Sequence, residues 1–368
     1  MSVSVDWGLA RRVAARVSSQ DPFAESYLYR SLAPDFAEFT EQAEHHVAEH
    51  TGLVAPTRAR GRVTDRAGWV DANLASFERL LRPLLDKLSA SGPPTSSRLD
   101  PRWNVLPNRV AGAIGPRVAG AEVGLLLGWM SGRVLGQYDL LIAEDDRPED
   151  QDLVYYVGPN ILSLEKRYGF PPREFRLWIA LHECTHRAQF TAVPWLRPYF
   201  LSLVDEMLSS VEADPKRLLE ALRSAVEQRR SGRSPLQEAG IAGLLATPEQ
   251  RATLARISGL MSLLEGHGDV TMDRAGAGLI PGQARFSRVL SERRRNSSGF
   301  NRFLQRLLGL EAKLAQYEEG ERFIHAVEAD GGRELFDRVW ERPEHVPSID
   351  EIRQPRRWIE RMTVPAGA

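Results

Sequence analysis

A five-residue segment, HECTH, contains the side chains whose types and spacing point most directly to chemistry. His182 and His186 stand four residues apart, and Glu183 directly follows the first histidine. On a helix, residues i and i+4 share one face, so both imidazoles can bind the same metal ion. Glu183 would lie about a quarter turn away, where it can reach a water bound to that metal. The pattern predicts metal-assisted hydrolysis with Zn²⁺ as the cofactor.

The helix that must carry this segment is predicted from its flanking prolines and its apolar periodicity. Pro171 and Pro172 precede it, as is common near a first helical turn, and Pro194 marks its end. The face that carries both histidines also collects Phe175, Trp178, Ile179, Gln189 and Phe190. The opposite face would carry Leu177, Ala180 and Ala188, with Arg176 and Arg187 at its edge. Two unpaired imidazoles on an apolar face would be costly to bury, which favours a shared metal ion.

A catalytic zinc site needs three protein ligands and one open position, so a third ligand must come from elsewhere. The best candidate segment is LLEGHGDVTMD, residues 263–273, on a predicted helix. Glu265 and His267 would point about 200° apart, so both cannot face one metal ion. Asp269 shares the face of Glu265 and can accept a hydrogen bond from the Nδ1–H of a ligating histidine. We predict Glu265 as the third ligand and Asp269 as the supporting carboxylate, with His267 as the main rival.

The remaining histidines are weaker ligand candidates. His325 lies in ERFIHAVE, and His345 lies in a proline-rich segment near the C-terminus. Three others occur in the charged segment EQAEHHVAEH and are expected to face solvent: His45, His46 and His50. Gly266 and Gly268 flank the rival His267, and their lack of a side chain would allow the HECTH helix to approach closely.

The elements around these residues are predicted to be mainly helical. Helical periodicity covers residues 4–50, 65–88, 108–134, 199–230, 248–274 and 299–329, and loops are expected at 89–101, 276–282 and 291–299. The clearest β signal is a predicted hairpin of 138–145 and 152–162, just before the HECTH helix. The predicted fold is therefore multi-helical with one small β element. We expect an N-terminal helical region, 1–100, and a metallohydrolase domain, 101–368, which can also form one continuous unit.

Composition excludes several classes of protein. The 368 residues carry a formal net charge of −1, so no basic field favours nucleic-acid binding. The longest apolar run is far too short for a membrane span, and the N-terminus lacks the apolar core of a signal peptide. Cys184 is the single cysteine, so no intrachain disulfide can form. These features predict a cytoplasmic protein that binds neither nucleic acid nor membrane. They give no information on its oligomeric state.

Longer stretches of the chain resemble a known family. H-E-x-x-H with a distant E-x-x-x-D resembles the glutamate-zincins in its site, although the gap from His186 to Glu265 is much longer than in thermolysin-like enzymes. A fuller resemblance is to an actinobacterial family of zinc-dependent metallopeptidases, the zincin-like type 2 or deazaflavin-coenzyme-biosynthesis-associated proteins. The stretches that carry it are VDWGLARRVAARV, VTDRAGWVDANLASFERLLRPLL, RVLGQYDLL, VGPNI, FRLWIALHECTHRAQFTAVPWLR, MSLLEGHGDVTMD and GLEAKLAQYEEGERF.

The resemblance implies a mainly helical fold with a zincin-like core, and peptidase activity is inferred from the motif. It implies neither a physiological substrate nor a flavin cofactor. The hypothesis is hydrolysis of an amide bond, in a peptide or small amide substrate. Glu183 would act as general base and later protonate the leaving amine. Tyr317 and His325 are candidate donors to the oxyanion of the transition state. In zincins, an edge strand before the H-E-x-x-H helix binds substrate by strand addition. Residues 154–161 occupy that place here, and Asn160 could present its amide to the substrate.

Three other functional classes stay open at this stage. A metal-binding scaffold without turnover would use the same ligands and leave Glu183 idle. A helical interaction protein with a fortuitous H-E-x-x-H would bind no stoichiometric metal. A hydrolase of non-peptide amides or esters would share the chemistry of attack with a peptidase.

Overall fold

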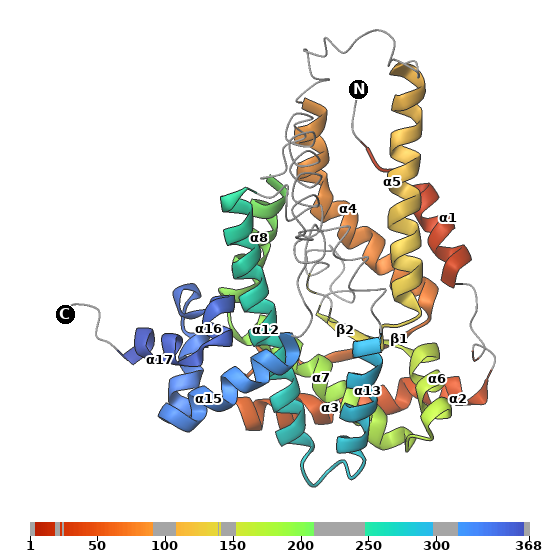
Figure 1. The fold of residues 1–368 in the computed structure, drawn as a ribbon. Coiled ribbons are helices and arrows are strands. Elements are labelled where there is room, and N and C mark those ends of the chain that lie inside the picture. The colour runs from red at the N-terminus through yellow and green to blue at the C-terminus, as the bar shows by residue number, and fades with distance from the viewer. Residues whose placement is uncertain are drawn as a thin grey trace, which may run out of the picture. The chain divides into compact units, whose positions relative to one another are not determined.

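The computed structural model describes residues 4–18, 23, 26–90, 108–138, 140, 152–209, 247–296 and 316–363. Helices dominate these residues, as Figure 1 shows, and a small sheet accompanies them. The chain divides into two compact units. Unit 1 comprises Met1–Thr40 and Ala59–Ile179, and unit 2 comprises Glu41–Arg58 and Ala180–Ala368. The predicted mainly α class is confirmed, whereas the predicted boundary near residue 100 stays a prediction.

Unit 1 is built on helices that pack through small residues. Its helices are α1 (Trp7–Ser18), α2 (Tyr27–Arg30), the start of α3 (Leu32–Thr51), α4 (Arg66–Ala90), α5 (Asn108–Ser131), α6 (Gly158–Tyr168) and the start of α7 (Pro172–Ala192). The α1 and α5 helices approach closely, because a Cβ on Gly124 would lie 2.4 Å from the carbonyl oxygen of Ala10. Trp69, Leu74 and Leu127 belong to the buried core of this unit.

The sheet of unit 1 has three strands in the order β1-β3-β2. Strand β3 (Leu153–Val157) pairs in parallel with β1 (Arg60–Thr64) and antiparallel with β2 (Gly136–Tyr138). The antiparallel pairing of the predicted hairpin is confirmed at Tyr138, and residues 139 and 141–151 lie outside the described part of the chain. Strand β1 was not predicted, because its partner is about 90 residues away and its sequence, RGRVT, is polar.

Two predictions about β3 are wrong. The strand ends at Val157, and residues 158–162 open helix α6, in which a proline occupies the first turn. Strand β3 is also central instead of being an edge strand, since β1 and β2 pair with its two sides over residues 154–156. Its backbone groups there are already used, so it cannot bind a substrate by strand addition.

Helices are the only regular elements among the described residues of unit 2. It contains the end of α3, the end of α7, α8 (Leu196–Ser209), α12 (Pro248–Gly276), α13 (Gln283–Asn296) and α15 (Gln316–Asp337). Short C-terminal pieces follow: η3 (Arg338–Trp340), η4 (Pro343–His345), α16 (Ile349–Arg353) and α17 (Pro355–Thr363). Residues 291–296, predicted as a loop, extend α13 instead. The helical predictions for 210–230 and 299–315 fall outside the described residues.

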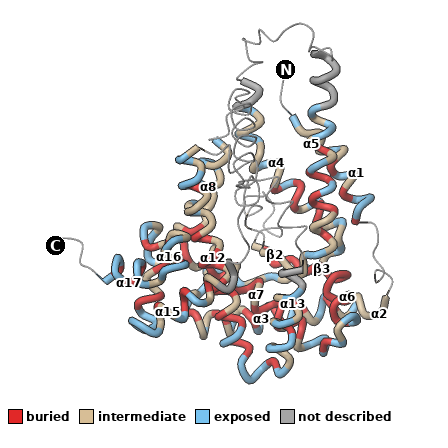
Figure 2. The backbone as a smooth tube through the Cα atoms, in the orientation of Figure 1, coloured by how far each residue is buried: buried red, intermediate tan, exposed pale blue. Residues whose placement is uncertain are grey.

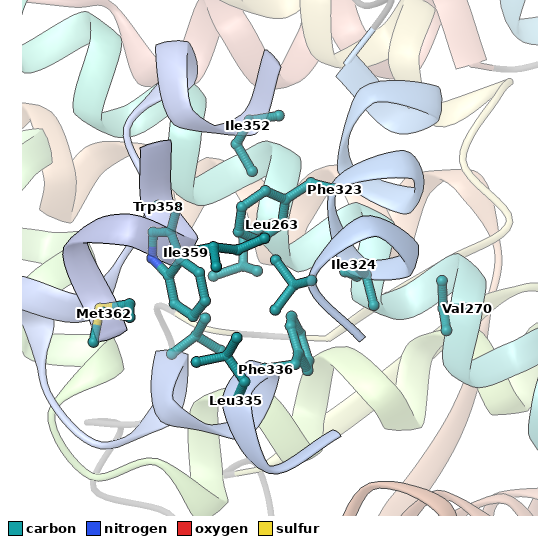
Figure 3. Close-up of a cluster of buried hydrophobic side chains, with 12 residues drawn as sticks. Leu263, Val270, Phe323, Ile324, Leu335, Phe336, Ile352, Trp358, Ile359 and Met362 are labelled. Atoms are coloured by element: carbon teal, nitrogen blue, oxygen red, sulfur yellow. The ribbon is translucent and has the colours of Figure 1, made fainter. Parts of the chain in front are cut away.

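The core of unit 2 fixes helix α12 against the C-terminal part of the chain. Leu263 of α12 lies among Phe323 of α15 and Trp358 and Ile359 of α17 (Figure 3). The rings of Phe323 and Trp358 meet edge to face at 5.5 Å. A capping box at Thr247 begins α12 by satisfying backbone donors of its first turn. Helix α12 is thus anchored at its start and along its length, before it presents residues 265–269.

Candidate metal centre

The middle of helix α7 is buried, and its two motif histidines are the exception there. Between Trp178 and Gln189, His182 and His186 are the only residues that are partly exposed, and the others are buried. Figure 2 colours the chain by burial and shows buried residues in α7. The predicted helix is confirmed. Most of its predicted histidine face is buried, at Phe175, Trp178, Ile179 and Gln189, whereas the two histidines themselves are partly exposed. The side chain of His186 is 16% exposed, and the residues between the two histidines are buried. A metal ion held by these two imidazoles would therefore be accessible to water.

Arg187, which belongs to the part of α7 in unit 2, was predicted at the edge of the helix but is buried. The side chain of Arg187 is 1% exposed and forms an ion pair with Glu44 at 2.7 Å. It also donates to the backbone oxygen of Thr57 at 2.6 Å. A buried guanidinium needs such partners, because an uncompensated charge inside a protein is strongly destabilising. These contacts fix the rotation of α7 and so the direction in which its histidines point.

Helix α12 repeats the pattern of α7. Between Ser262 and Met272, only Glu265 and Asp269 are partly exposed, and they lie one turn apart on one face. The predicted shared face of these two carboxylates agrees with this burial pattern. Between Ser262 and Met272, the helix therefore exposes only these two carboxylate side chains and buries the other residues.

The two glycines near His267 have different neighbours. A Cβ added to Gly268 would lie 3.3 Å from Cε1 of His186 and 3.7 Å from Cε1 of His182. Gly268 thus allows both imidazoles to approach α12, as predicted. Gly266 does not face the HECTH helix, because a Cβ there would meet the backbone of Gly320 in α15 at 2.4 Å. Its role is to let α15 pack against α12.

Three potential ligand atoms converge in unit 2. The Nε2 atoms of His182 and His186 lie 3.2 Å apart, and Nε2 of His186 lies 3.7 Å from Oε2 of Glu265. All three ligand atoms fall within 4.8 Å of one another. Ligands about 2.1 Å from a tetrahedral zinc ion would be separated by about 3.4 Å. The observed spacing therefore fits one metal ion, and the third member is the predicted Glu265.

The electrostatics of the trio favour a cation. Burial opposes the charged form of His186, but the charge and hydrogen bond of Glu265, with the charge of Glu183, raise the pKa of His186 to about 9. In the metal-free protein at neutral pH, both ring nitrogens of His186 are therefore protonated and the ring is positively charged. A divalent metal would take the place of one of these protons between the same groups.

The rival ligand His267 takes no part in the trio. Its ring is 5% exposed and packs against Phe336 and Trp340, with centroids 5.8 Å and 5.0 Å away. Its Nδ1 lies 2.9 Å from Nε2 of Gln189. Burial, together with the positive charges of His186, Arg333 and Arg274, lowers the pKa of His267 to about 3. The ring is therefore neutral, and it points into the protein.

Gln189 is a polar residue of the site to which sequence analysis gave no role. It is fully buried, and its Oε1 lies 3.0 Å from Nδ1 of His186. Its Nε2 also donates to the backbone oxygen of Leu264 at 2.9 Å. The available signal was its spacing, since Gln189 was placed on the histidine face of α7 and a buried polar side chain there requires partners.

The other predicted site residues are placed as follows. Glu183 is 7% exposed and acts on the pKa of His186 through its charge. The His325 ring is 55% exposed and lies 3.6 Å from Glu321. The side chain of Tyr317 lies outside the described residues. Asn160, in unit 1, is buried in the first turn of α6.

The amide of Asn160 is engaged within unit 1. Its Nδ2 donates to the backbone oxygens of Ser131 and Val134, both at 2.6 Å, and its Oδ1 accepts from Arg66 at 2.8 Å. These bonds join the start of α6 to the end of α5. The predicted contact of Asn160 with substrate stays a prediction.

Comparison with known proteins identifies the family. The family described as zincin-like metallopeptidase matches residues 5–359, which is nearly the whole chain. The chain belongs to this family. The chain is similar to a crystal structure from Chloroflexus aurantiacus described as "a putative hydrolase with a novel fold". The two share 33% sequence identity and a TM-score of 0.73, over 98% of this chain and 100% of that one. No curated protein matches the sequence.

The membership agrees with a candidate metal site in the described part of the chain. A zincin-like family implies a metal ion, and the described residues provide a His-His-Glu cluster for it. Within the described residues, no helix has both the length and the apolar character that crossing a membrane requires.

Proposed function

We propose that this protein is a zinc-dependent metallopeptidase that cleaves peptide bonds by attack of water. The observation that carries the proposal is the convergence of His182, His186 and Glu265, with Glu183 next to the first ligand in the same helix. Two imidazoles and one carboxylate form a ligand set that leaves one position open on a four-coordinate zinc ion. That open position is the difference between a catalytic and a structural site.

The ligand chemistry favours zinc over the hard cations. Ca²⁺ and Mg²⁺ take oxygen ligands, whereas two of the three candidate atoms here are imidazole nitrogens. Asp269, on the same face as Glu265, is proposed to support a ligand histidine through a hydrogen bond. When bound, the metal ion polarises the scissile carbonyl and lowers the pKa of the attacking water.

Glu183 is proposed to move the proton in this reaction. As general base it accepts a proton from the attacking water, and it then donates that proton to the nitrogen of the leaving amine. Its position next to His182 in sequence turns it away from the ligand pair while keeping it within reach. Tyr317 and His325 remain our proposed donors to the oxyanion, and Asn160 our proposed substrate contact.

A peptide or small amide is proposed as the substrate, since both present the carbonyl and amine that this chemistry requires. The protein is proposed to act in the cytoplasm, where its buried Cys184 would stay reduced. The second candidate function is a metal-binding scaffold without turnover, which the same ligands would serve.

Hydrolysis of a quenched peptide library by wild-type protein and by Glu183→Gln tests the proposal. The variant replaces a carboxylate by an amide of the same shape, so it should keep one zinc ion per chain and lose at least about 100-fold in rate. Equal rates in the two proteins would contradict the role of Glu183. Zinc binding without turnover of any library member would favour the scaffold.

A further inference from the structure

We propose that Gln189 is a positioning residue that fixes the tautomer of His186 and ties it to the backbone next to Glu265, and that neutral His267 holds the Gln189 amide in place. The inference requires a metal at the trio, and it does not depend on the identity of the substrate. It concerns three side chains of unit 2 that form one continuous chain of hydrogen bonds.

The first link sets the protonation of His186. Its Nε2 faces Nε2 of His182 and Oε2 of Glu265, so this is the nitrogen that a metal would bind. The proton of the neutral ring must then lie on Nδ1, which is 3.0 Å from Oε1 of Gln189. A hydrogen bond from Nδ1–H to this oxygen selects the tautomer that leaves Nε2 available, and it makes Nε2 a better ligand.

The second link determines which end of the Gln189 amide faces His186. Nε2 of Gln189 is 2.9 Å from the backbone oxygen of Leu264, and a carbonyl oxygen can only accept. The NH₂ group must therefore face Leu264, which leaves Oε1 for His186. A flipped amide would put two oxygens 2.9 Å apart and point NH₂ hydrogens at Nδ1–H of His186. Since Leu264 directly precedes Glu265, this bond also joins the two helices that carry the ligands.

The third link uses the second hydrogen of the NH₂ group. It points to Nδ1 of His267 at 2.9 Å, which must accept it and so must carry no proton. The remaining proton of His267 lies on Nε2, 3.4 Å from the hydroxyl of Thr271. Phe336 and Trp340 pack against the ring and prevent its rotation. The Gln189 amide can therefore make its hydrogen bonds to His186, Leu264 and His267 together in one orientation only.

The test measures metal binding and not turnover. Zinc affinity is measured by chelator competition, and ligand geometry by the visible absorption of the Co²⁺-substituted protein. Gln189→Met keeps the length of the side chain and deletes its hydrogen bonds, so zinc affinity should fall 10- to 100-fold, as for other partners of metal ligands. The cobalt absorption should change with it. Gln283→Met is the matched control, because Gln283 bonds Asp273 of α12 but no ligand.

A pair of variants at His267 separates hydrogen bonding from packing. His267→Asn keeps an acceptor near the place of Nδ1, whereas His267→Leu has a similar volume and no acceptor. Zinc affinity should fall about tenfold in His267→Leu and distinctly less in His267→Asn. This pair also decides the matter if Gln189→Met fails to fold, which melting of the metal-free proteins would reveal.

Several results would overturn the inference. One is a Gln189→Met variant that binds zinc as tightly as the wild type and has an unchanged cobalt spectrum. Another is an equal loss of zinc affinity in His267→Leu and His267→Asn. Absence of zinc and cobalt binding by the wild-type protein would remove the site altogether. Metal binding without peptide hydrolysis would leave this inference standing while the proposed function failed.

Discussion

Replacing the third ligand by its amide should lower the pKa of a histidine on the facing helix. In the metal-free protein, Glu265 is the main group that raises the pKa of His186 to about 9 against the effect of burial. Glu265→Gln removes the negative charge and preserves the shape of the side chain. The pKa of His186 should therefore fall to its ordinary value or below, because burial then acts with less opposition.

The size of this change follows from the distance between the two groups. Nε2 of His186 lies 3.7 Å from Oε2 of Glu265. With an effective dielectric constant of about 20, unit charges at this separation attract by about 4 kcal/mol. That energy corresponds to a pKa change of about 3. A fall from about 9 to near 6 is expected in the variant.

The assay is a proton NMR titration of the imidazole signals in metal-free protein, with His186 assigned by its loss in His186→Gln. Glu321→Gln is the control, because it removes an exposed carboxylate near His325 and should leave His186 unchanged. A His186 pKa near 6.5 in the wild type would refute the reasoning. So would the same His186 pKa in wild type and Glu265→Gln.

Further predictions follow from the same geometry. Zinc must displace the proton of His186, so zinc affinity should rise about tenfold per pH unit from neutral pH up to about 9, with proton release measurable by calorimetry in two buffers. The raised pKa of His186 stabilises the metal-free fold, and this stabilisation is fully present below about pH 6.5. The free energy of unfolding, measured with urea, should fall by about 3 kcal/mol as pH rises from about 6.5 through about 9. Gly268→Ala should crowd both ligand rings and weaken zinc binding by about 1 kcal/mol, read by chelator competition. Arg187→Met should reduce the free energy of unfolding by about 3 kcal/mol, because it removes the buried cation beside Glu44.

The sequence could predict the members of the His182, His186 and Glu265 cluster, because helical spacing determines which residues of each helix share a face. Two predictions need only the geometry of a single helix. One is that His182 and His186 share a face, and the other is that Glu265 and His267 point about 200° apart. The burial of α12 and the position of the His267 ring agree with that geometry. The bounds of α7 and α12 were likewise predictable from prolines and apolar periodicity.

Long-range pairing explains what the sequence could not predict. Strand β1 pairs in parallel with β3 across about 90 residues, and nothing in RGRVT alone indicates that partner. Arg187 was expected at a helix edge, since its burial depends on Glu44 and Thr57, which lie far away in the chain. Gln189 was placed on the correct face, but its partners Leu264 and His267 could be assigned only once α12 was in position.

The central claim, that His182, His186 and Glu265 hold a catalytic zinc ion, is tested most directly by the metal content of the purified protein. Elemental analysis should be performed on protein prepared without affinity-column nickel and then offered zinc. We predict about one zinc ion per chain in the wild type, retained in His267→Asn and lost in Glu265→Gln. Zinc retained in Glu265→Gln but lost in His267→Asn, or no zinc in the wild type, would contradict it.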